Sequence, residues 1–309
     1  MATFASSRGG PGQAQTPGGL RLFLQRRSTF AFLLCLPLIF IIGSLVVYPF
    51  FYAIFLSMLN KAETEFVGLG NYIFLMGRST FLMVMQQSII FALASVFLKC
   101  LVGFIVAHLI NGVLDTGQRL WRGLLLVPWV IPPALSTLGW WWLFDPTYSA
   151  INWALEGIGI SEIPWLSDVF WARVSVILVN VWYGAPFFMI MYLAALKSIP
   201  AELYDAAKVD GASGWQQLIH VTLPMMRNIM AITVLFSTIV TFANFDIVRV
   251  LTQGGPRNTT HLFATYAFKV GIEGGDIPLG ASVSLFMFPV LALLAFFILR
   301  NVRQRAARV

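Results

Sequence analysis

The sequence predicts an all-α, polytopic membrane protein with six transmembrane helices, and three observations lead to this prediction. Of the 309 residues, 58% are hydrophobic and only 11% are charged, whereas soluble domains carry roughly 25% charged residues. Six apolar segments reach the length of about 20 residues that a helix needs to cross the hydrocarbon core. None of them alternates apolar and polar residues as a barrel strand does. Because lipid offers backbone amides no hydrogen-bond partner, these segments must be helical.

The predicted spans are separated by shorter polar connections. The first comprises residues 29–55 and is expected to be an uncleaved anchor, because no small-residue cleavage site follows a short apolar stretch. The other five comprise residues 81–110, 123–144, 169–196, 228–251 and 279–299. Around them we expect three regions. These are a disordered cytoplasmic tail at 1–25, where large apolar side chains are scarce, a six-span domain at 26–300, and a basic cytoplasmic tail at 301–309.

The positions of lysine and arginine predict the orientation in the membrane. When the amino terminus is placed inside, most basic residues fall on the inner side, as the positive-inside rule requires. The inner set is Arg8, Arg21, Arg26, Arg27, Arg119, Arg122, Lys197, Lys208, Arg227, Arg300, Arg303, Arg305 and Arg308. Both termini are therefore expected in the cytoplasm, with the chain crossing the plasma membrane. The net charge of +7 then reflects topology and attraction to anionic membrane lipid rather than binding to nucleic acid.

Several kinds of chemistry have no signature in the chain. Its two cysteines, Cys35 and Cys100, lie in apolar segments where a disulfide framework is implausible. The common motifs of metal, acyl-transfer and nucleotide sites do not occur. We therefore predict no catalytic residue, no metal ligand and no cofactor on this chain. Any ATP that drives its function must be bound by another subunit.

A polar segment at 199–224 lies between the fourth and fifth predicted spans. Pro200 and the helix-forming residues after it predict a short helix that ends at the turn signal Asp210-Gly211. Ser213 and Gln216 match a capping box that starts a second helix at 214–222, before Pro224 opens the fifth span. Small and charged side chains on the first helix suit a docking element for another protein. An amphipathic connector lying on lipid headgroups is the alternative, which periodicity does not exclude.

The segment DAAKVDGASGWQQLIHVTLP resembles the cytoplasmic signature of permeases in binding-protein-dependent ABC importers. Asp205, Ala206, Ala207, Asp210, Gly211, Ala212, Leu223 and Pro224 stand at matching positions. The chain departs from the usual pattern at Asp205, where glutamate is usual, and at Leu218, where phenylalanine is common. In that family the loop inserts a coupling helix into a cleft of the ATPase subunit. The resemblance implies that role for Glu202, Asp205, Ala206, Ala207, Asp210, Gly211 and Ala212.

Other phrases extend the resemblance over most of residues 30–300, to the maltose-type permeases that import carbohydrates. They are FVGLGNY at 66–72, the W-x-x-x-P pattern at 182–186, LAALKSIPAELYDAA at 193–207, and NFDIVRVLTQGGPRNTT at 244–260. The resemblance implies half of a translocation pore and a second homologous permease as partner. It further implies two ATPase subunits that bind ATP and magnesium, and an extracytoplasmic sugar-binding protein. The implied substrate is a di- or oligosaccharide such as trehalose or a maltose-like glucoside.

Polar and aromatic residues within the predicted spans are candidates for the substrate path, because polar groups in lipid are costly. Asn244, Phe245 and Asp246 offer amide, aromatic and carboxylate contacts to a sugar, and Trp182 and Tyr183 offer stacking surface. Each has a structural alternative. The Trp182-Tyr183 pair is typical of helix packing, and Asp246 is three residues from Arg249 and could neutralise it.

Lys99 and the overall function also leave alternatives open. Lys99 could extend toward the membrane surface, pair across helices or contact the substrate. An ion-gradient-driven secondary transporter would use Asp246 and Lys99 as coupling residues, and it predicts an internal inverted repeat, which is not evident. A membrane-embedded enzyme would need a convergent catalytic set that the chain lacks. A passive channel would give the 199–224 element no purpose.

Overall fold

The computed structural model describes residues 27–112 and 115–306, and the described chain is predominantly helical. The predicted tail at 1–25 lies outside these residues. Two compact units are distinguished, Met1–Tyr52 and Ala53–Val309. The described part of the first unit holds α2 (Arg27–Ile42), the π-helical turn η1 (Gly43–Val47) and the beginning of α3 (Tyr48–Ser57). This continuous helix confirms that the first predicted span is helical.

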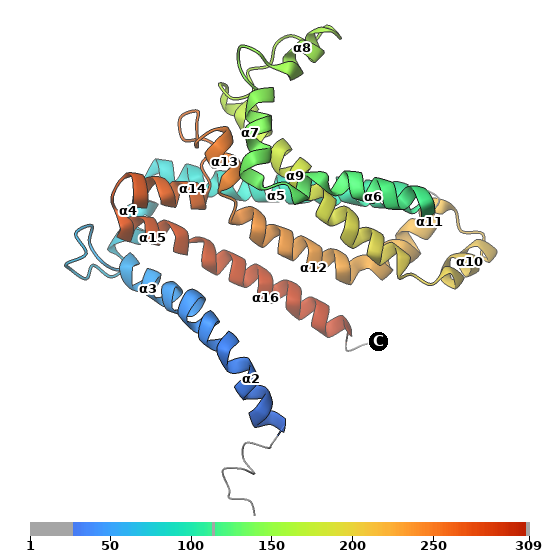
Figure 1. Cartoon of the computed structure of the whole chain (residues 1–309), viewed down its shortest axis with the longest axis horizontal. Coiled ribbons are helices and arrows are strands. Elements are labelled where there is room, and N and C mark those ends of the chain that lie inside the picture. The colour runs from blue at the N-terminus through green and yellow to red at the C-terminus, as the bar shows by residue number, and fades with distance from the viewer. Residues whose placement is uncertain (1–26, 113–114, 307–309) are drawn as a thin grey trace, which may run out of the picture. The chain divides into compact units, whose positions relative to one another are not determined.

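The second unit is built around two long helices, α5 (Ser79–Asn111) and α9 (Val169–Lys197), which pack together along their length (Figure 1). Two glycines bring them close. Gly103 of α5 lies against Phe188, and Gly184 of α9 lies against Lys99. The two contacting pairs are separated by the same number of residues, so moving along α5 means moving the same way along α9, and the helices run parallel. This direction agrees with the predicted topology, in which the second and fourth spans cross the membrane the same way.

The third predicted span, 123–144, is not one straight helix. It is divided into α6 (Asp115–Val130) and α7 (Pro133–Leu143), which meet at an angle of 90°. The bend falls at Pro132 and Pro133, where proline removes backbone donors and its ring prevents the helix from continuing. The described residues therefore contain five helices that are long and apolar enough to cross a membrane, or six if the bent pair is one span.

The polar segment after α9 leads into the fifth span without a break. After α10 (Ala201–Val209), one helix runs from Gly214 to Phe242 through α11 (Gly214–Gln217), the π-helical turn η2 (Leu218–Thr222) and α12 (Leu223–Phe242). The second short helix was expected to end at Thr222, but the helix continues through Pro224, which lies just after the π-helical turn η2. The helix instead ends at Phe242, nine residues before the predicted end of the span at 251.

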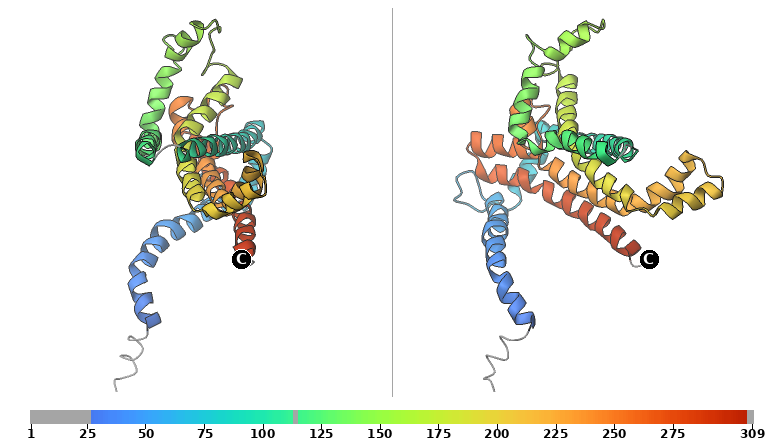
Figure 2. Two further views of the ribbon diagram at one scale, coloured as in Figure 1. Left: turned by 90° about the vertical axis from the view of Figure 1, so that its right-hand side faces the viewer. Right: turned by 45° about the vertical axis from the view of Figure 1, so that its right-hand side comes forward.

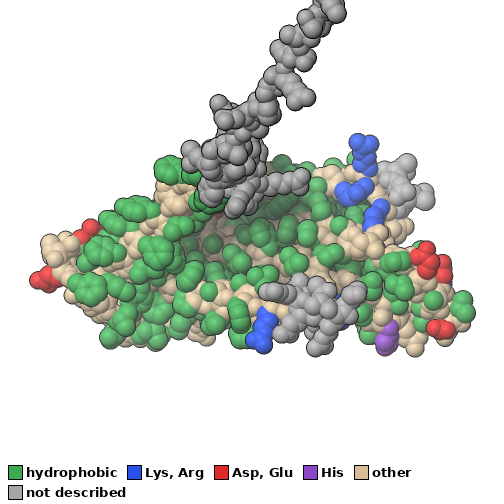
Figure 3. Space-filling model, turned by 90° about the horizontal axis from the view of Figure 1, so that it is seen from below, with side chains coloured by type: hydrophobic (Ala, Val, Ile, Leu, Met, Phe, Trp, Pro, Cys, Tyr) green, Lys and Arg blue, Asp and Glu red, His purple; other side chains and the backbone are tan. Residues whose placement is uncertain are grey.

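The remaining helices complete the second unit. They are α4 (Gly70–Met76), α8 (Ala150–Glu156), α13 (Asp246–Leu251), α14 (Phe263–Phe268), η3 (Lys269–Glu273), α15 (Ile277–Leu285) and α16 (Met287–Ala306). The last span is described by α15 and α16 together, and α16 lies beside α12 (Figure 2). It continues to Ala306, into the segment expected to be a tail. Hydrophobic side chains cover much of the face drawn in Figure 3, as expected for a surface in contact with lipid.

Candidate functional site

The predicted docking helix is present as α10, with the turn that the sequence indicated. Asp210 caps its carboxyl end, and Gly211 follows with a φ of +75°. The amide of Gly211 donates to the carbonyl of Lys208 at 3.0 Å, and the amide of Ala212 donates to that of Ala207 at 2.9 Å. These two bonds make a Schellman motif, which favours glycine at the left-handed position. The backbone from Ala207 to Ala212 is therefore a defined turn rather than a loose connection.

The capping box behind this turn is confirmed. The Ser213 amide donates to Oε1 of Gln216 at 2.7 Å, and the Gln216 amide donates to the Ser213 hydroxyl at 3.4 Å. This fixes the start of the helix that becomes the fifth span. A cavity of about 300 Å³ lies between the turn and this helix, lined by Ala207, Asp210, Gly211, Ala212, Gln216, Gln217, His220 and Val221.

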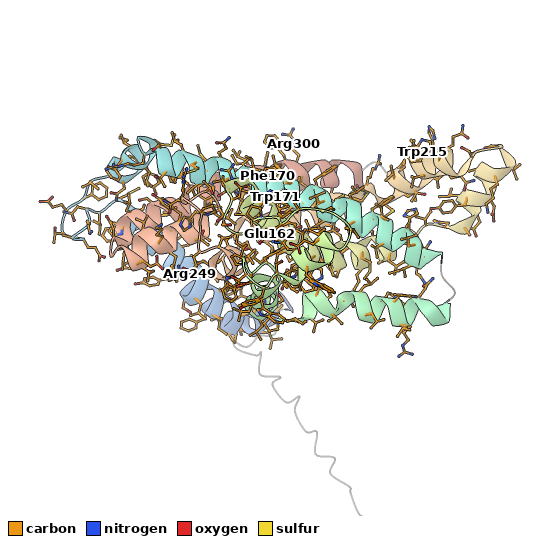
Figure 4. All side chains as sticks on the ribbon, turned by 90° about the horizontal axis from the view of Figure 1, so that it is seen from above. Glu162, Phe170, Trp171, Trp215, Arg249 and Arg300 are labelled. Atoms are coloured by element: carbon orange, nitrogen blue, oxygen red, sulfur yellow. The ribbon has the colours of Figure 1, made fainter. Side chains whose placement is uncertain are left out.

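The charged residues of α10 face outward. Glu202, Asp205 and Asp210 are exposed, as is Ala206, while Ala207 is half-buried. Asp205 forms an exposed ion pair with Lys208 at 3.1 Å, which can exchange for a partner's charge at little cost. Apolar side chains are exposed beside them, with Val209 88% and Trp215 69% accessible. Figure 4 shows Trp215 well separated from Arg249, which follows the far end of α12.

The docking element is tied to the spans by its inner side. The Tyr204 hydroxyl of α10 and the Thr222 hydroxyl of η2 are 3.0 Å apart and hydrogen-bonded. Ile199, just before α10, is buried in the same core as Leu196 of α9 and Met226 of α12. These contacts connect α10 to both neighbouring spans.

The predicted path residues of the fifth span lie just beyond its helix. Asn244 occupies the break after α12, Phe245 precedes α13 and Asp246 is the first residue of α13. The Asn244 side-chain oxygen is buried, and no described atom hydrogen-bonds to it. Phe245 packs edge-to-face on Phe268 of α14, with ring centroids 5.3 Å apart. Neither proline nor glycine marks this break, so the sequence pattern did not reveal it.

The aromatic pair of α9 lies near the same break. Tyr183 is within electrostatic range of Asp246, which brings the two halves of the predicted path together. Trp182 packs edge-to-face on Trp140 of α7, with ring centroids 5.5 Å apart. Trp182 thus packs against another aromatic side chain in this conformation, while the Asp246 charge acts on Tyr183.

Lys99 was not among the predicted path residues, yet it lies between them. Its side chain is buried, and its ammonium donates to the Thr241 hydroxyl at 3.0 Å. Its stem occupies the space that a side chain at Gly184 would fill. The expectation that Lys99 could reach the membrane surface is wrong for this structure. The spacing of Gly184 opposite an intramembrane lysine is visible only once α5 and α9 are aligned.

Arg249 does not neutralise Asp246, contrary to one of the two sequence interpretations. It forms an ion pair with Glu273 of η3 at 2.7 Å, and its guanidinium lies over the Phe268 ring at 4.9 Å from the centroid. Because these partners are far apart in sequence, helical periodicity could not reveal them. Asp246 makes no ion pair within 4.0 Å among the described residues, so its carboxylate stays available.

The loop after α13 encloses a histidine. Gly254 has a φ of +87° and lies directly on the His261 ring, so a side chain there would collide with it. The His261 Nδ1 is bonded to the Thr265 hydroxyl at 3.1 Å. Burial, and to a smaller extent the nearby Lys269 charge, lowers the pKa of His261 to about 4. In the ranges 27–112 and 115–306, no group of three His, Cys, Asp or Glu residues is placed to hold a metal ion.

The arrangement of the helices resembles that of the permeases of type I ABC importers. A bacterial ABC transporter that imports the acidic polysaccharide alginate has a chain with the same fold, with a TM-score of 0.79 at 22% sequence identity. The match covers 92% of this chain and 98% of that one. A second structure, of an alginate transporter in complex with an alginate pentasaccharide-bound periplasmic protein, gives a TM-score of 0.76 at 23% identity over 90% and 96% of the two chains.

The chain belongs to the family described as binding-protein-dependent transport system inner membrane component, which matches residues 101–308. It is 30% identical to the trehalose/maltose transport system permease protein MalF of Thermococcus litoralis, over 85% of this chain and 90% of that protein. A probable ABC transporter permease of Sinorhizobium fredii is 33% identical over 86% of each chain. The maltose/maltodextrin permease MalF of Escherichia coli is 31% identical, but the match spans 73% of this chain and only 46% of that protein.

This membership decides between the function classes that the sequence left open. The chain is the membrane permease component of an ABC transporter, a multi-pass protein of the inner membrane, and it is not itself catalytic. The secondary-transporter alternative is set aside.

Proposed function

We propose that the chain is the permease subunit of an ATP-driven importer of a di- or oligosaccharide, and that it forms half of the translocation pore. The observation that carries this proposal is the exposed turn from Asp205 to Ala212, held rigidly to α9 and α12 through Ile199 and Tyr204. An exposed and ordered turn of this kind can be bound by a partner protein and moved together with it. Within the six-span domain at 26–300, the loop at 197–224 would be the coupling loop.

The proposed partners follow from the family. Two ATPase subunits bind ATP and magnesium, a second homologous permease completes the pore, and an extracytoplasmic binding protein delivers the sugar. Glu202, Asp205, Ala206, Ala207, Asp210, Gly211 and Ala212 would contact the ATPase. Closure of the ATPase dimer would carry α10 with it and switch the spans between inward-facing and outward-facing states.

The proposed cargo contacts are Asn244, Phe245, Asp246, Trp182 and Tyr183. The unpartnered amide oxygen of Asn244 and the free carboxylate of Asp246 can accept hydrogen bonds from sugar hydroxyls. Tyr183 can add an aromatic surface for the apolar face of a sugar ring. Trehalose and maltose-like glucosides are the first candidates, because the named relatives transport trehalose, maltose or maltodextrin.

Reconstitution of the complete transporter tests the proposal. ATP-dependent accumulation of labelled saccharide should occur in proteoliposomes that contain both permeases, the ATPase pair and the binding protein. Asn244→Ala and Asp246→Ala should reduce uptake while the complex still assembles and hydrolyses ATP. If both variants import at the wild-type rate, the cargo contacts are assigned wrongly. If no saccharide accumulates with the wild-type transporter, the proposed function itself fails.

A further inference from the structure

Lys99 is an ionisable residue buried in the interior of the spans, and no carboxylate among the described residues forms an ion pair with it. The residue is 4% exposed and sits roughly 30 Å along α5 from Ser79, at 1.5 Å per residue. The closest polar contact of its ammonium is the neutral Thr241 hydroxyl. No carboxylate among the described residues lies within 4.0 Å of it, since the ion pairs there join Lys208 to Asp205 and Arg249 to Glu273.

The surroundings of Lys99 are shaped to hold this side chain. Gly184 on α9 leaves the space that the stem occupies, because a Cβ at that position would lie 2.7 Å from the lysine Cε. Thr241 supplies one acceptor for an ammonium that has three protons to donate. A lysine that is packed this closely does not extend to the membrane surface. Its charge acts at this depth.

Further polar atoms without partners lie on the same helices. Ser95 of α5 and Asn180 of α9 are buried, and no hydrogen bond reaches the Ser95 hydroxyl or the Asn180 side-chain oxygen within the described chain. The contacts Gly103–Phe188 and Lys99–Gly184 join residues separated by the same number of positions in the sequence. Ser95 and Asn180 are separated by that same number, so they lie at the same level of the two parallel helices. The Asn244 side-chain oxygen, just past Thr241, is likewise unpaired. The Ser95 hydroxyl can donate to an anion beside the ammonium, whereas the two amide oxygens accept and can bind the hydroxyls of the same saccharide.

Lys99 contacts residues next to the proposed cargo path on two sides. On one side it touches Gly184, which follows Tyr183 in α9. On the other side it touches Thr241, three residues before Asn244. A molecule that passes between α9 and the break after α12 therefore meets this ammonium when the helices separate. Alternating access requires such a separation.

We propose that Lys99 is a specificity-determining cargo contact, which selects a saccharide that carries a carboxylate or a phosphate group. The proposal rests on the proposed function and narrows its substrate class. Neutral hydroxyls could be held by amides or hydroxyls, which cost far less to bury than a charge. A lysine in the spans is costly unless an opposite charge reaches it. An anionic group on the cargo supplies that charge, and the hydrogen bond becomes charge-assisted.

The test uses two matched pairs of labelled probes in proteoliposomes that contain the complete transporter and its binding protein. Maltitol and maltobionate share an open-chain terminal residue and differ by a carboxylate, and trehalose and trehalose 6-phosphate differ by a phosphate, so the pairs distinguish the two sources of negative charge. ATP-dependent uptake is compared between the wild type, Lys99→Gln and Lys99→Arg. The binding protein is the same in all samples, so its selectivity cancels in the ratio of variant to wild type.

We expect the wild type to accumulate at least one acidic probe in preference to its neutral counterpart. Lys99→Gln should lower uptake of that acidic probe at least about tenfold, the effect of losing one hydrogen bond between charged groups. The uptake of neutral probes should change little, and Lys99→Arg should retain most acidic uptake because it keeps the charge. Lys61→Gln removes the same charge from an exposed outer loop and should leave the preference unchanged.

Two results would overturn the inference while the proposed function stands. One is accumulation of the neutral probes alone. The other is an equal loss of neutral and acidic uptake in Lys99→Gln, which would make the lysine a structural support for the helices. Absence of any ATP-dependent saccharide uptake by the wild type would instead remove the proposed function together with the inference.

Discussion

The ammonium of Lys99 donates a hydrogen bond to the hydroxyl of Thr241 at 3.0 Å, across 142 residues of the chain. The bond joins the second span to the outer end of the fifth. Since the ammonium has no described carboxylate partner, this hydroxyl is the main compensation for burying it. Its loss has a measurable consequence.

Thr241→Val should lower the stability of the purified complex, because valine keeps the shape of threonine but leaves the buried ammonium without its acceptor. An unsatisfied buried polar group costs about 1–3 kcal/mol, and more if charged. The measurement is the thermal inactivation midpoint in detergent. Thr233→Val is the matched control, because that buried hydroxyl bonds only to the Ile229 carbonyl one turn away. Equal midpoints for the two variants would mean that the Lys99 contact contributes nothing.

Gly211→Val should uncouple ATP hydrolysis from sugar uptake. Gly211 adopts a φ of +75° in the turn after α10, and a left-handed conformation costs an ordinary residue roughly 1–2 kcal/mol. A β-branched residue there should deform the surface formed by Asp205 to Ala212. The measurement is the number of sugars imported per ATP hydrolysed. Gly214→Ala, at a position with open space around it, should leave this ratio near the wild-type value.

Tyr204→Phe should also reduce the sugar imported per ATP, but less than Gly211→Val. It removes the hydroxyl that bonds to Thr222 at the start of the fifth span, while the ring stays packed in the core. One intramolecular hydrogen bond contributes about 0.5–1.5 kcal/mol. Tyr148→Phe removes a hydroxyl from a side chain that is 81% exposed, and it should have no effect on coupling.

Gly103→Ala should lower the amount of folded permease in the membrane. An alanine Cβ at this position would lie 2.3 Å from the Phe188 Cβ and 3.0 Å from the Met189 amide nitrogen, so α5 and α9 would have to separate. Overpacking of this kind costs about 1–3 kcal/mol. Gly139→Ala on α7 is the control, because no described neighbour lies within 4 Å of its added methyl. Wild-type yield from Gly103→Ala would contradict the close packing.

The stability of the transporter should depend on pH through His261. Burial and then the Lys269 charge hold the pKa of His261 at about 4 in the folded chain, below the 6.5 of an exposed histidine. As pH falls below 6.5, the unfolded chain takes up a proton before the folded chain does, so stability is lost between pH 6.5 and 4. His261→Gln should flatten this part of the stability profile.

Features set by local sequence could be predicted well. The turn at Asp210-Gly211, the capping box of Ser213 and Gln216, and the extents of α5 and α9 follow from the residues within each segment. The bend between α6 and α7 could be predicted only in part. Pro132 and Pro133 disfavour a continuous helix, but neither proline nor hydropathy reports an angle.

Features set by contacts between distant segments could not be predicted. Arg249 pairs with Glu273 because α13 and η3 meet in the fold, whereas the sequence offered only Asp246 within one helical turn. Lys99 was an isolated charge until the packing of α5 against α9 and α12 gave it Gly184 and Thr241 as neighbours. The end of α12 at Phe242 also lacked a local signal, because Ala243 and Asn244 are not strong helix breakers.

The uninterrupted helix from Gly214 to Phe242 is 29 residues long, or roughly 43 Å at 1.5 Å per residue. Each residue adds about 100° of rotation, so the azimuth of Thr241 is fixed relative to that of the capping box. The number of residues between the two ends therefore determines the relative directions in which their side chains point. A single inserted residue would turn Thr241 away from Lys99 without altering any side chain at either end. An insertion of seven would nearly restore the phase while lengthening the rod by roughly 10 Å.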